Sequence, residues 1–443
     1  MNRTIRALRC RPRILFHMQR SAAFVCSNNC GQLNEASQPR VWQRKMTTPS
    51  TKENFHRVPD ATPIEEELLP GYRAEDYYPV TTDQTLNSRY RIICKLGRGV
   101  GSTVWLAEDV KTSQYQAVKV CTRTTGGAVP TQASQEIAVA EYLKTAPVQE
   151  HPGRRGVRTA LDSFTLNGPH GTHTCLVYAP QGMTFTELRE YLPENRLAKR
   201  MLQTSVQVLL IVMDYLHKNN VVHTDISPNN ILVGATDDAV FSQLEKDEQA
   251  RPVARKVLPD RTIYMSRPVP RTNGQLVLSD MGSARFGQET FKGDIMPDVY
   301  RAPEVILGME WSSKVDLWSV GVMIWDLLEG KRLFSAKKDG VLDDEQHLAE
   351  MVSLMGNPPP EFVRRSTICA RFFDDAGNWK GSTPIPDQSF EERITQVQGE
   401  DKELLLGFVR SVLCWLPEER PTAEELAYDD FLMQAYFAAQ SGR

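Results

Sequence analysis

Apolar residues between positions 90 and 180 come in short runs that are rich in β-branched and aromatic side chains. The runs YRIICKLGRG and STVWLAEDV lie on either side of glycines, and YQAVKVCTR follows them. Such runs are typical of β-strands. From Thr186 onward the apolar positions recur every three or four residues, as in LAKRMLQTSVQVLLIVMDYLHKN, which is the period of an α-helix. The pattern predicts an α+β fold of two lobes, strand-rich over 90–180 and mainly helical over 181–436.

Two stretches lack a clear period. Residues 50–89 are polar, contain several prolines and include the acidic patch IEEELL, which predicts a linker and pre-lobe segment. Residues 234–275 are also polar and Pro-containing, which predicts a flexible insertion that does no chemistry itself. The last residues, 437–443, are expected to form a short tail.

Composition adds limits to this picture. At 443 residues the chain exceeds one ordinary core, which fits two lobes. Its 41% hydrophobic and 24% charged residues are typical of soluble globular proteins, and because no run of about 18 apolar residues is present, we expect no membrane association. Most cysteines lie in apolar runs and are expected to be buried, reduced thiols. Cys26 and Cys30 have no second ligand pair nearby, so we expect no zinc site.

Charge is distributed unevenly along the chain. Residues 1–49 hold nine Arg or Lys against one acidic residue, Glu35. Since the whole chain has 52 basic and 55 acidic residues, the remainder carries a net charge of −11. An acidic body attracts basic partners, although it also serves solubility alone.

The first 24 residues are rich in Arg and free of acids, which is the composition of a mitochondrial transit peptide. Two alternatives stay open: a disordered basic tail, or a start site at Met46. We expect a cytoplasmic or nuclear protein, with mitochondria as the alternative if the segment is a transit peptide.

The segment LGRGVGSTVWLAED places glycines in a turn between two predicted strands, where backbone N–H groups can approach phosphates. The motif AVKV follows and places Lys119 where its ammonium could bind the α and β phosphates of a nucleotide. Glu136 lies on the next predicted helix and is the expected partner of Lys119, with Glu141 as the alternative. The residues expected to bind the nucleotide in this lobe are Leu96, Gly97, Gly99, Gly101, Val104, Ala117 and Lys119.

Three oxygen-bearing side chains follow at intervals that suit phosphoryl transfer from Mg-ATP. In VHTDISPNNIL, Asp225 would orient the attacking hydroxyl, and Asn230 would offer its amide oxygen to Mg²⁺. In LSDMG, Asp280 would chelate the metal that bridges the β and γ phosphates. Each residue alone could be an ordinary turn or helix-capping residue. Taken with Lys119 and Glu136, these three residues predict an active site. Its catalytic residues are Asp225, Lys119 and Glu136, and its metal ligands are Asn230 and Asp280.

The chain resembles protein kinases, and it is most similar to the SR-protein kinase family. The motifs that carry the resemblance span about residues 70–435 and include GYRAEDYYPV, HTD, YRAPEVILG, VDLWSVGVMIWDLLEG and LPEERPTAEEL. The resemblance implies a bilobal protein-kinase fold, ATP and Mg²⁺ as cofactors, and a serine/threonine kinase. It further implies Arg-Ser-rich protein substrates related to splicing, no direct nucleic-acid binding, and a monomer.

The same resemblance assigns further roles. It makes residues 234–275 a shortened spacer, and VYAPQG the hinge, with Tyr178 as gatekeeper and the backbone of Ala179 and Gln181 bonding to adenine. It pairs Glu304 with Arg420 in a buried ion bridge. It also places Asp316 where it braces the backbone of the catalytic loop.

Two positions depart from the kinase pattern. Ser227 stands where most serine/threonine kinases carry a Lys, whose charge contacts the γ-phosphate; without it, transition-state stabilisation falls. Asp298 stands where relatives in this group commonly have an Arg. These departures motivate one alternative to the active serine/threonine kinase. It is a pseudokinase scaffold that binds nucleotide or a partner without phosphoryl transfer. A small-molecule phosphotransferase is a second alternative, which the block from APE to Arg420 disfavours.

The acidic segment DGVLDDE at 339–345 offers a candidate docking site for basic substrates. Its other interpretation is an exposed acidic loop with a structural role. Replacement of Asp343, Asp344 and Glu345 distinguishes the two.

Overall fold

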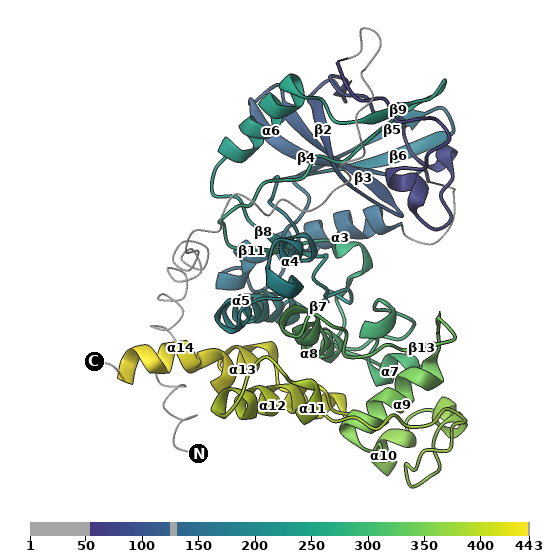
Figure 1. The fold of residues 1–443 in the computed structure, drawn as a ribbon, viewed down its shortest axis with the longest axis vertical. Coiled ribbons are helices and arrows are strands. Elements are labelled where there is room, and N and C mark those ends of the chain that lie inside the picture. The colour runs from purple at the N-terminus through teal and green to yellow at the C-terminus, as the bar shows by residue number, and fades with distance from the viewer. Residues whose placement is uncertain (1–53, 125–130, 442–443) are drawn as a thin grey trace.

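The computed structural model describes residues 54–124 and 131–441, and these form two lobes (Figure 1). The N-lobe holds an antiparallel sheet in the order β1-β2-β3-β4-β6-β5. The predicted α+β bilobal fold is confirmed. The basic segment, Cys26 and Cys30 lie outside the described residues. The strands of this sheet are β1 (Thr85–Leu86), β2 (Tyr90–Gly99), β3 (Ser102–Asp109), β4 (Gln114–Cys121), β5 (Asp162–Gly168) and β6 (Gly171–Tyr178).

One face of the sheet carries the N-lobe core. Ile92, Trp105, Val118 and Val177 are each 3% exposed or less and pack in one cluster. These β-branched and aromatic residues come from four different strands, so their packing fixes the register between them. Helix α3 (Gln132–Thr145) begins at the cap residue Thr131, whose side chain accepts a hydrogen bond from the Ser134 amide.

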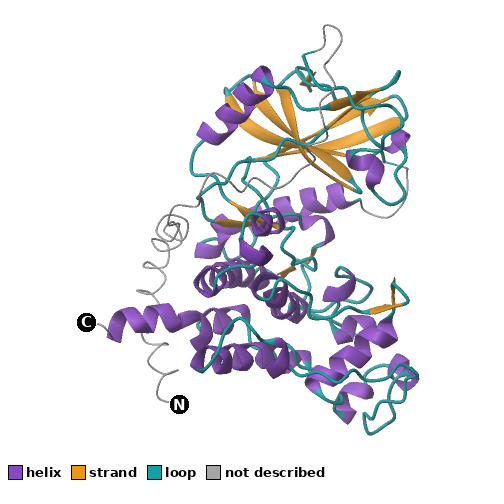
Figure 2. Cartoon of the chain, in the orientation of Figure 1, coloured by secondary structure: helices purple, strands orange, loops and turns teal. Residues whose placement is uncertain are grey.

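Helices make up most of the C-lobe (Figure 2). The central helix is α8 (Lys314–Leu328), in which every residue from Val315 to Leu328 is buried. A helix that is apolar on all sides belongs in the middle of a core. The other C-lobe helices are α4 (Phe185–Glu190), α5 (Lys199–Lys218), α7 (Pro303–Ile306), α9 (Asp344–Met355), α10 (Pro360–Val363), α11 (Phe390–Arg393), α12 (Glu400–Val412), α13 (Ala423–Ala427) and α14 (Asp430–Ser441).

Short strand pairs in the C-lobe join two segments that are distant in sequence. Strand β7 (Val221–Val222) pairs with β12 (Arg285–Phe286), and β8 (Ile231–Val233) pairs with β11 (Leu276–Leu278). The loop between β7 and β8 therefore lies beside the loop between β11 and β12. The pair β13 (Lys337–Lys338) and β14 (Val341–Leu342) forms a separate hairpin before α9.

The insertion is folded, so the prediction of a flexible segment is wrong. It contains α6 (Ala239–Ala250) and the pair β9 (Arg255–Val257) and β10 (Thr262–Tyr264), and Figure 1 shows α6 beside β2. Phe241 and Leu244 are buried against Ile93 and Leu106 of the sheet. The elements are too short to give a strong periodic signal, and their stability comes from docking on the N-lobe.

The pre-lobe segment is also ordered, which differs from the predicted linker. It contains the 3-10 helices η2 (Glu65–Leu68) and η3 (Ala74–Asp76), and the sheet begins within it at β1. The acidic patch is largely paired: Glu66 bonds the fully buried Lys95 of β2, and Glu67 lies 2.6 Å from Lys256 of β9. Composition alone did not show that these charges have partners.

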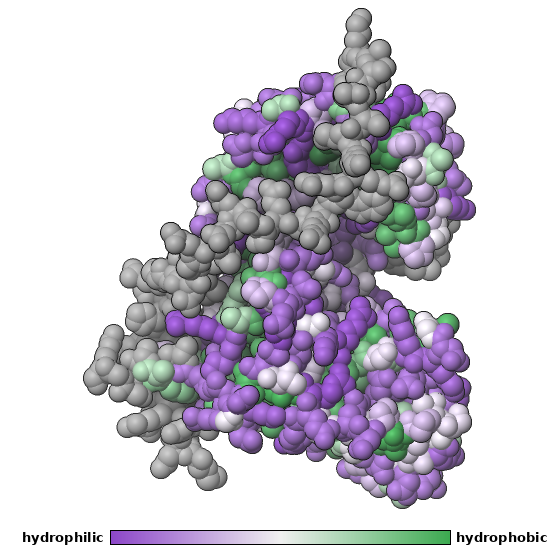
Figure 3. Space-filling view, in the orientation of Figure 1, coloured by the Kyte–Doolittle hydropathy of each residue, from purple (hydrophilic) through white to green (hydrophobic). Residues whose placement is uncertain are grey.

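The surface seen in Figure 3 is mostly polar, and a hollow separates the two lobes on one side. Among residues 54–124 and 131–441, no helix is long and apolar enough to cross a membrane. The described cysteines are free: Cys94, Cys121, Cys175, Cys369 and Cys414.

Candidate active site

The glycine-rich turn joins β2 to β3 and leaves open space beside it. A Cβ atom added at Gly97 or Gly99 would meet no other atom within 4 Å, and one at Gly101 would lie 3.2 Å from the Gln132 side chain. Missing side chains at the first two positions therefore leave room for a ligand to approach the backbone.

An apolar cluster lies next to this turn. Ala117 and Tyr178 are buried in it, and Leu96 and Val104 are partly buried against it. Ala117 and Tyr178 are direct neighbours across β4 and β6, and Ala179 and Gln181 follow β6 on the connection to the C-lobe. The cluster thus brings together Leu96, Val104 and Ala117, which the sequence assigns to nucleotide binding, and the gatekeeper Tyr178.

Lys119 lies between two carboxylates. Its Nζ is 2.5 Å from Oε1 of Glu136 and 3.5 Å from Oδ1 of Asp280. Burial disfavours the charged lysine, but Asp280 and Glu136 outweigh it and raise the pKa of Lys119. Glu141 instead pairs with Lys144 on the surface of α3, so the structure places Glu136 in the expected partner position.

Contacts made by two side chains, those of Tyr178 and Arg158, hold Glu136 and the hinge, and the sequence did not suggest them. The Tyr178 hydroxyl donates a hydrogen bond to Oε2 of Glu136. The Arg158 guanidinium lies 4.5 Å from the centre of the Tyr178 ring and donates to the Ala179 carbonyl and to the Ser279 hydroxyl at 3.2 Å. Arg158 precedes β5 without any motif around it, so only its position in the fold reveals the contact.

Asp225 and Asn230 are linked directly in the loop between β7 and β8. The Asn230 side-chain nitrogen donates to the carbonyl and to Oδ2 of Asp225, both at 2.8 Å. Because that nitrogen is engaged, Oδ1 is the Asn230 atom that can turn to a cation. Burial is the main cause that raises the pKa of Asp225, and nearby Asp280 adds to it.

Asp280 has a left-handed backbone with φ of 67°, which Asp tolerates better than most residues. Its Oδ1 accepts from the Gly282 amide at 3.3 Å. Burial works toward a higher pKa for Asp280, but Lys119 and the Gly282 amide lower it overall. A charged carboxylate is the form that binds a divalent cation.

The catalytic loop, which joins β7 to β8 and carries Asp225, is held by Asp316 of α8. The Asp316 side chain is fully buried. Its carboxylate accepts from the backbone amides of His223 at 2.9 Å and Thr224 at 2.8 Å. His223 in turn accepts from the Asp225 amide through Nδ1 and donates from Nε2 to the Ser279 carbonyl. The two loops that carry Asp225 and Asp280 are therefore joined through one imidazole.

The ion bridge that the resemblance implies is present and buried. Arg420 donates from its two terminal nitrogens to the two carboxylate oxygens of Glu304, at 2.6 and 2.8 Å. Both side chains are 1% exposed or less, and Arg420 also lies 5.0 Å from the Trp318 ring centre. This bidentate pair joins α7 to the segment before α13.

The two departures lie in different surroundings. Ser227 is 7% exposed, and its carbonyl accepts from the Asn230 amide at 3.0 Å. Asp298 is exposed at the start of a turn whose last residue, Tyr300, is buried and bonds Asp326 of α8 through its hydroxyl. Asp298 thus leaves the anchoring of Tyr300 intact.

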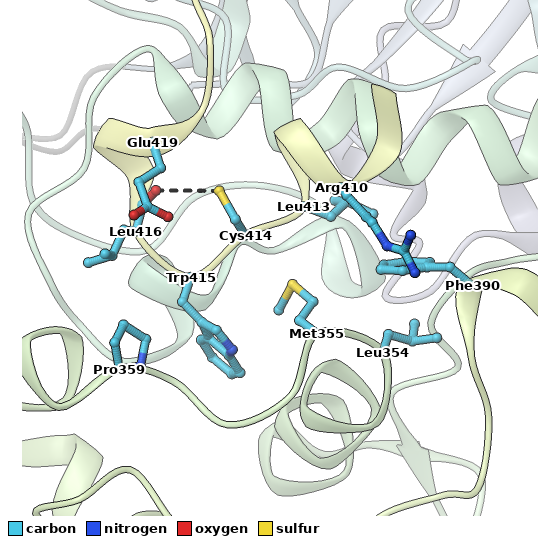
Figure 4. Close-up of a pocket in the computed structure, with 10 residues that line it drawn as sticks. All are labelled: Leu354, Met355, Pro359, Phe390, Arg410, Leu413, Cys414, Trp415, Leu416 and Glu419. Atoms are coloured by element: carbon cyan, nitrogen blue, oxygen red, sulfur yellow. Dashed lines mark hydrogen bonds between the residues drawn. The ribbon is translucent and has the colours of Figure 1, made fainter. Parts of the chain in front are cut away.

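A second hollow, of about 310 Å³, lies in the C-lobe (Figure 4). None of the predicted site residues lines it. Cys414 in its wall donates a weak hydrogen bond to the Leu416 carbonyl at 3.5 Å, and burial raises the pKa of this thiol. The lining residues are Leu354, Met355, Pro359, Phe390, Arg410, Leu413, Cys414, Trp415, Leu416 and Glu419.

Comparison with known proteins agrees with this geometry. The protein kinase domain family model matches residues 90–432. A serine/threonine protein kinase of Aspergillus fumigatus is 38% identical over 393 residues, which cover 87% of this chain and 95% of that protein. The serine/threonine-protein kinase SRPK of Physarum polycephalum is 29% identical over 388 residues, covering 82% and 90%.

A kinase domain solved by crystallography has the same fold, with a TM-score of 0.61 at 22% identity over 81% of this chain and 99% of that domain. The chain therefore belongs to the protein kinase family and is a serine/threonine protein kinase similar to SRPK.

Proposed function

We propose that this kinase transfers the γ-phosphate of Mg-ATP to serine or threonine in basic, Arg-Ser-rich proteins. One observation carries the transfer step. Three separate segments supply the active-site residues, namely β4 (Lys119), the loop between β7 and β8 (Asp225 and Asn230) and the loop after β11 (Asp280), and a continuous set of contacts joins them. No single structural requirement of the fold needs this collection of charges in one place.

Each residue has one task in this proposal. Asp225 accepts a hydrogen bond from the substrate hydroxyl and orients it toward the phosphorus atom. Lys119, held by Glu136, binds the α and β phosphates of ATP. The open space at Gly97 and Gly99 lets backbone N–H groups approach the phosphates.

Asp280 and Asn230 suit Mg²⁺ as ligands. Mg²⁺ binds hard oxygen donors, and these residues offer a carboxylate with a lowered pKa and an amide whose nitrogen is already engaged. When bound, the metal neutralises charge on the β and γ phosphates. The residues present therefore fit the metal that the family uses.

The substrate class rests on two supports outside the catalytic centre. The relative from Physarum is named SRPK, and residues 50–443 carry a net charge of −11, which attracts basic segments. Transfer from labelled ATP to an Arg-Ser-repeat peptide, compared with the same peptide carrying Gln for Arg, tests this class. We expect preference for the Arg-Ser peptide, and equal incorporation into both contradicts the substrate assignment.

Ser227→Lys tests whether the missing cation limits catalysis. A lysine here adds a positive charge near Asp225, and we expect kcat to rise about tenfold, since one electrostatic contact to a transition state contributes this much or more. Ser227→Met introduces a side chain about as long as lysine but without its charge, so it should not raise kcat. A rise from a measurable wild-type rate supports an active kinase, whereas a silent wild type that gains activity supports the scaffold alternative.

The acidic residues at the start of α9, which are its cap residue Asp343 and its first two residues, have internal partners, which favours their structural role. Asp343 accepts from the Gln346 amide at 2.7 Å, Asp344 lies 2.7 Å from Arg301, and Glu345 bonds the Ser382 hydroxyl at 3.0 Å. Replacing all three with Ala should lower unfolding free energy by about 1–2 kcal/mol, mainly through the lost cap, and change KM for a basic peptide less than about twofold.

Asp339→Asn, in the same segment, is the control for charge alone. Urea unfolding and peptide kinetics on both variants check this expectation. A large rise in KM with unchanged stability in the triple variant would establish the docking role instead.

A further inference from the structure

Tyr77 lies directly outside the glycine-rich turn. Its hydroxyl is 2.9 Å from the Val100 carbonyl and 3.2 Å from the Gly99 carbonyl, so its single proton is shared between two consecutive peptide groups. The side chain is 7% exposed, and its ring lies 5.3 Å from that of Tyr72, centre to centre. This packing holds the ring in place whether or not the hydroxyl is present.

The geometry of the peptide bond gives this contact a consequence for the turn. In a trans peptide, the C=O of one residue and the N–H of the next point in opposite directions. With the carbonyls of Gly99 and Val100 bonded to Tyr77, the N–H groups of Val100 and Gly101 point away from it. These are the N–H groups that a glycine-rich turn offers to phosphate oxygens.

Tyr77 is itself anchored on two sides. On one side, Asp76 lies 2.7 Å from the Arg123 guanidinium, and the Arg123 amide donates to the Asp76 carbonyl at 2.8 Å. Arg123 follows β4, the strand that carries Lys119. On the other side, Arg261 of the insertion donates to the carbonyls of Ala74 and Tyr77. These contacts fix the position of Tyr77, and through it that of the glycine-rich turn, relative to the strand that carries Lys119.

We propose that Tyr77 is a positioning residue for nucleotide binding. It fixes the tip of the glycine-rich turn before ATP arrives, so that the cost of ordering the turn is met during folding rather than during binding. The proposal rests on the proposed use of ATP. Tyr77 lies in the pre-lobe segment, 13 residues before the start of β2. The proposal therefore gives this segment a direct part in the affinity for ATP.

Tyr77→Phe removes the hydroxyl and keeps the ring. Loss of a neutral hydrogen bond of this kind should raise Kd and KM for ATP about fivefold and leave kcat within about twofold. Hydrogen exchange at the Val100 and Gly101 amides of the nucleotide-free protein should become faster. Tyr115→Phe is the matched control, because its hydroxyl bonds Glu245 of α6 at 2.7 Å in the same lobe without touching the turn.

Full-length wild type, Tyr77→Phe and Tyr115→Phe are compared by ATP titration and by exchange. An effect on Kd and on exchange in Tyr77→Phe but not in Tyr115→Phe supports the proposal. Equal effects in the two variants, or no effect in either, overturn it. If the wild type binds no ATP, the proposed function fails, and unchanged exchange in Tyr77→Phe would independently overturn the positioning role.

Discussion

Replacing Asp225 with Asn should lower kcat for phosphoryl transfer by about 10²- to 10⁴-fold, the range that a positioned acid or base contributes. The amide keeps the size of the carboxylate but loses the anionic acceptor for the substrate hydroxyl. Asp225 is held by Asn230 and by the loop that Asp316 braces, so the substitution should leave the loop in place. Steady-state initial rates with labelled ATP, measured at saturating ATP and peptide, give the size of the loss in kcat.

The control for this prediction is Asp375→Asn, which makes the same chemical change at an exposed position of the C-lobe. It should retain the wild-type rate. ATP affinity should stay within about twofold in both variants, because Asp225 is assigned to the hydroxyl and not to the phosphates. An Asp225→Asn protein with nearly full kcat would remove Asp225 from the mechanism.

Glu304→Gln should produce the largest loss of stability, about 3–5 kcal/mol in unfolding free energy. The substitution leaves the Arg420 guanidinium buried without its counter-charge, which is the costly way to break a buried ion pair. Trp318 lies under that guanidinium, so its fluorescence during urea unfolding follows the affected region.

An exposed ion pair in the same lobe provides the comparison. Arg365 and Glu418 have side chains that are 37% and 57% exposed, and Glu418→Gln should cost less than about 1 kcal/mol. The double variant Glu304→Gln with Arg420→Met should recover part of the loss, since it removes the unpaired charge. Similar losses from Glu304→Gln and Glu418→Gln would contradict the importance of burial.

The active site was predictable from sequence because most of its reacting residues lie in short motifs. Asp225 and Asn230 are five positions apart in one loop, and Asp280 lies two positions before Gly282, whose amide donates a hydrogen bond to its side chain. Lys119 and Glu136 were found from a strand followed by a helix. The choice between Glu136 and Glu141 needed the structure, which shows the ion pair directly.

The insertion and the pre-lobe segment were not predictable in the same way. Their helices and strands are short, and their charges resemble those of solvated loops. In the structure, Lys95 and Lys256 are at most 2% exposed, and their carboxylate partners come from a segment about 30 or 190 residues away. Such long-range pairing leaves no local pattern, because the residues next to either partner in the sequence do not indicate where the other partner lies.

Contacts made by single residues were missed for the same reason. Tyr178 was recognised as a hinge residue, but its bond to Glu136 joins β6 to α3. Arg158 lies outside every motif, and Tyr77 lies within GYRAEDYYPV, a motif that does not indicate contact with the glycine-rich turn. Each acts through a neighbour that the fold brings close. Sequence therefore predicted the reacting groups better than the residues that position them.

The most direct test of the account is a crystal structure of the kinase with a non-hydrolysable ATP analogue and Mn²⁺, whose anomalous scattering locates the metal. Mn²⁺ binds the same oxygen ligands as Mg²⁺. We predict an anomalous peak coordinated by Asp280 and by Oδ1 of Asn230, with the Lys119 ammonium bonded to the α or β phosphate. A bound analogue whose metal contacts neither Asp280 nor Asn230 would contradict the account.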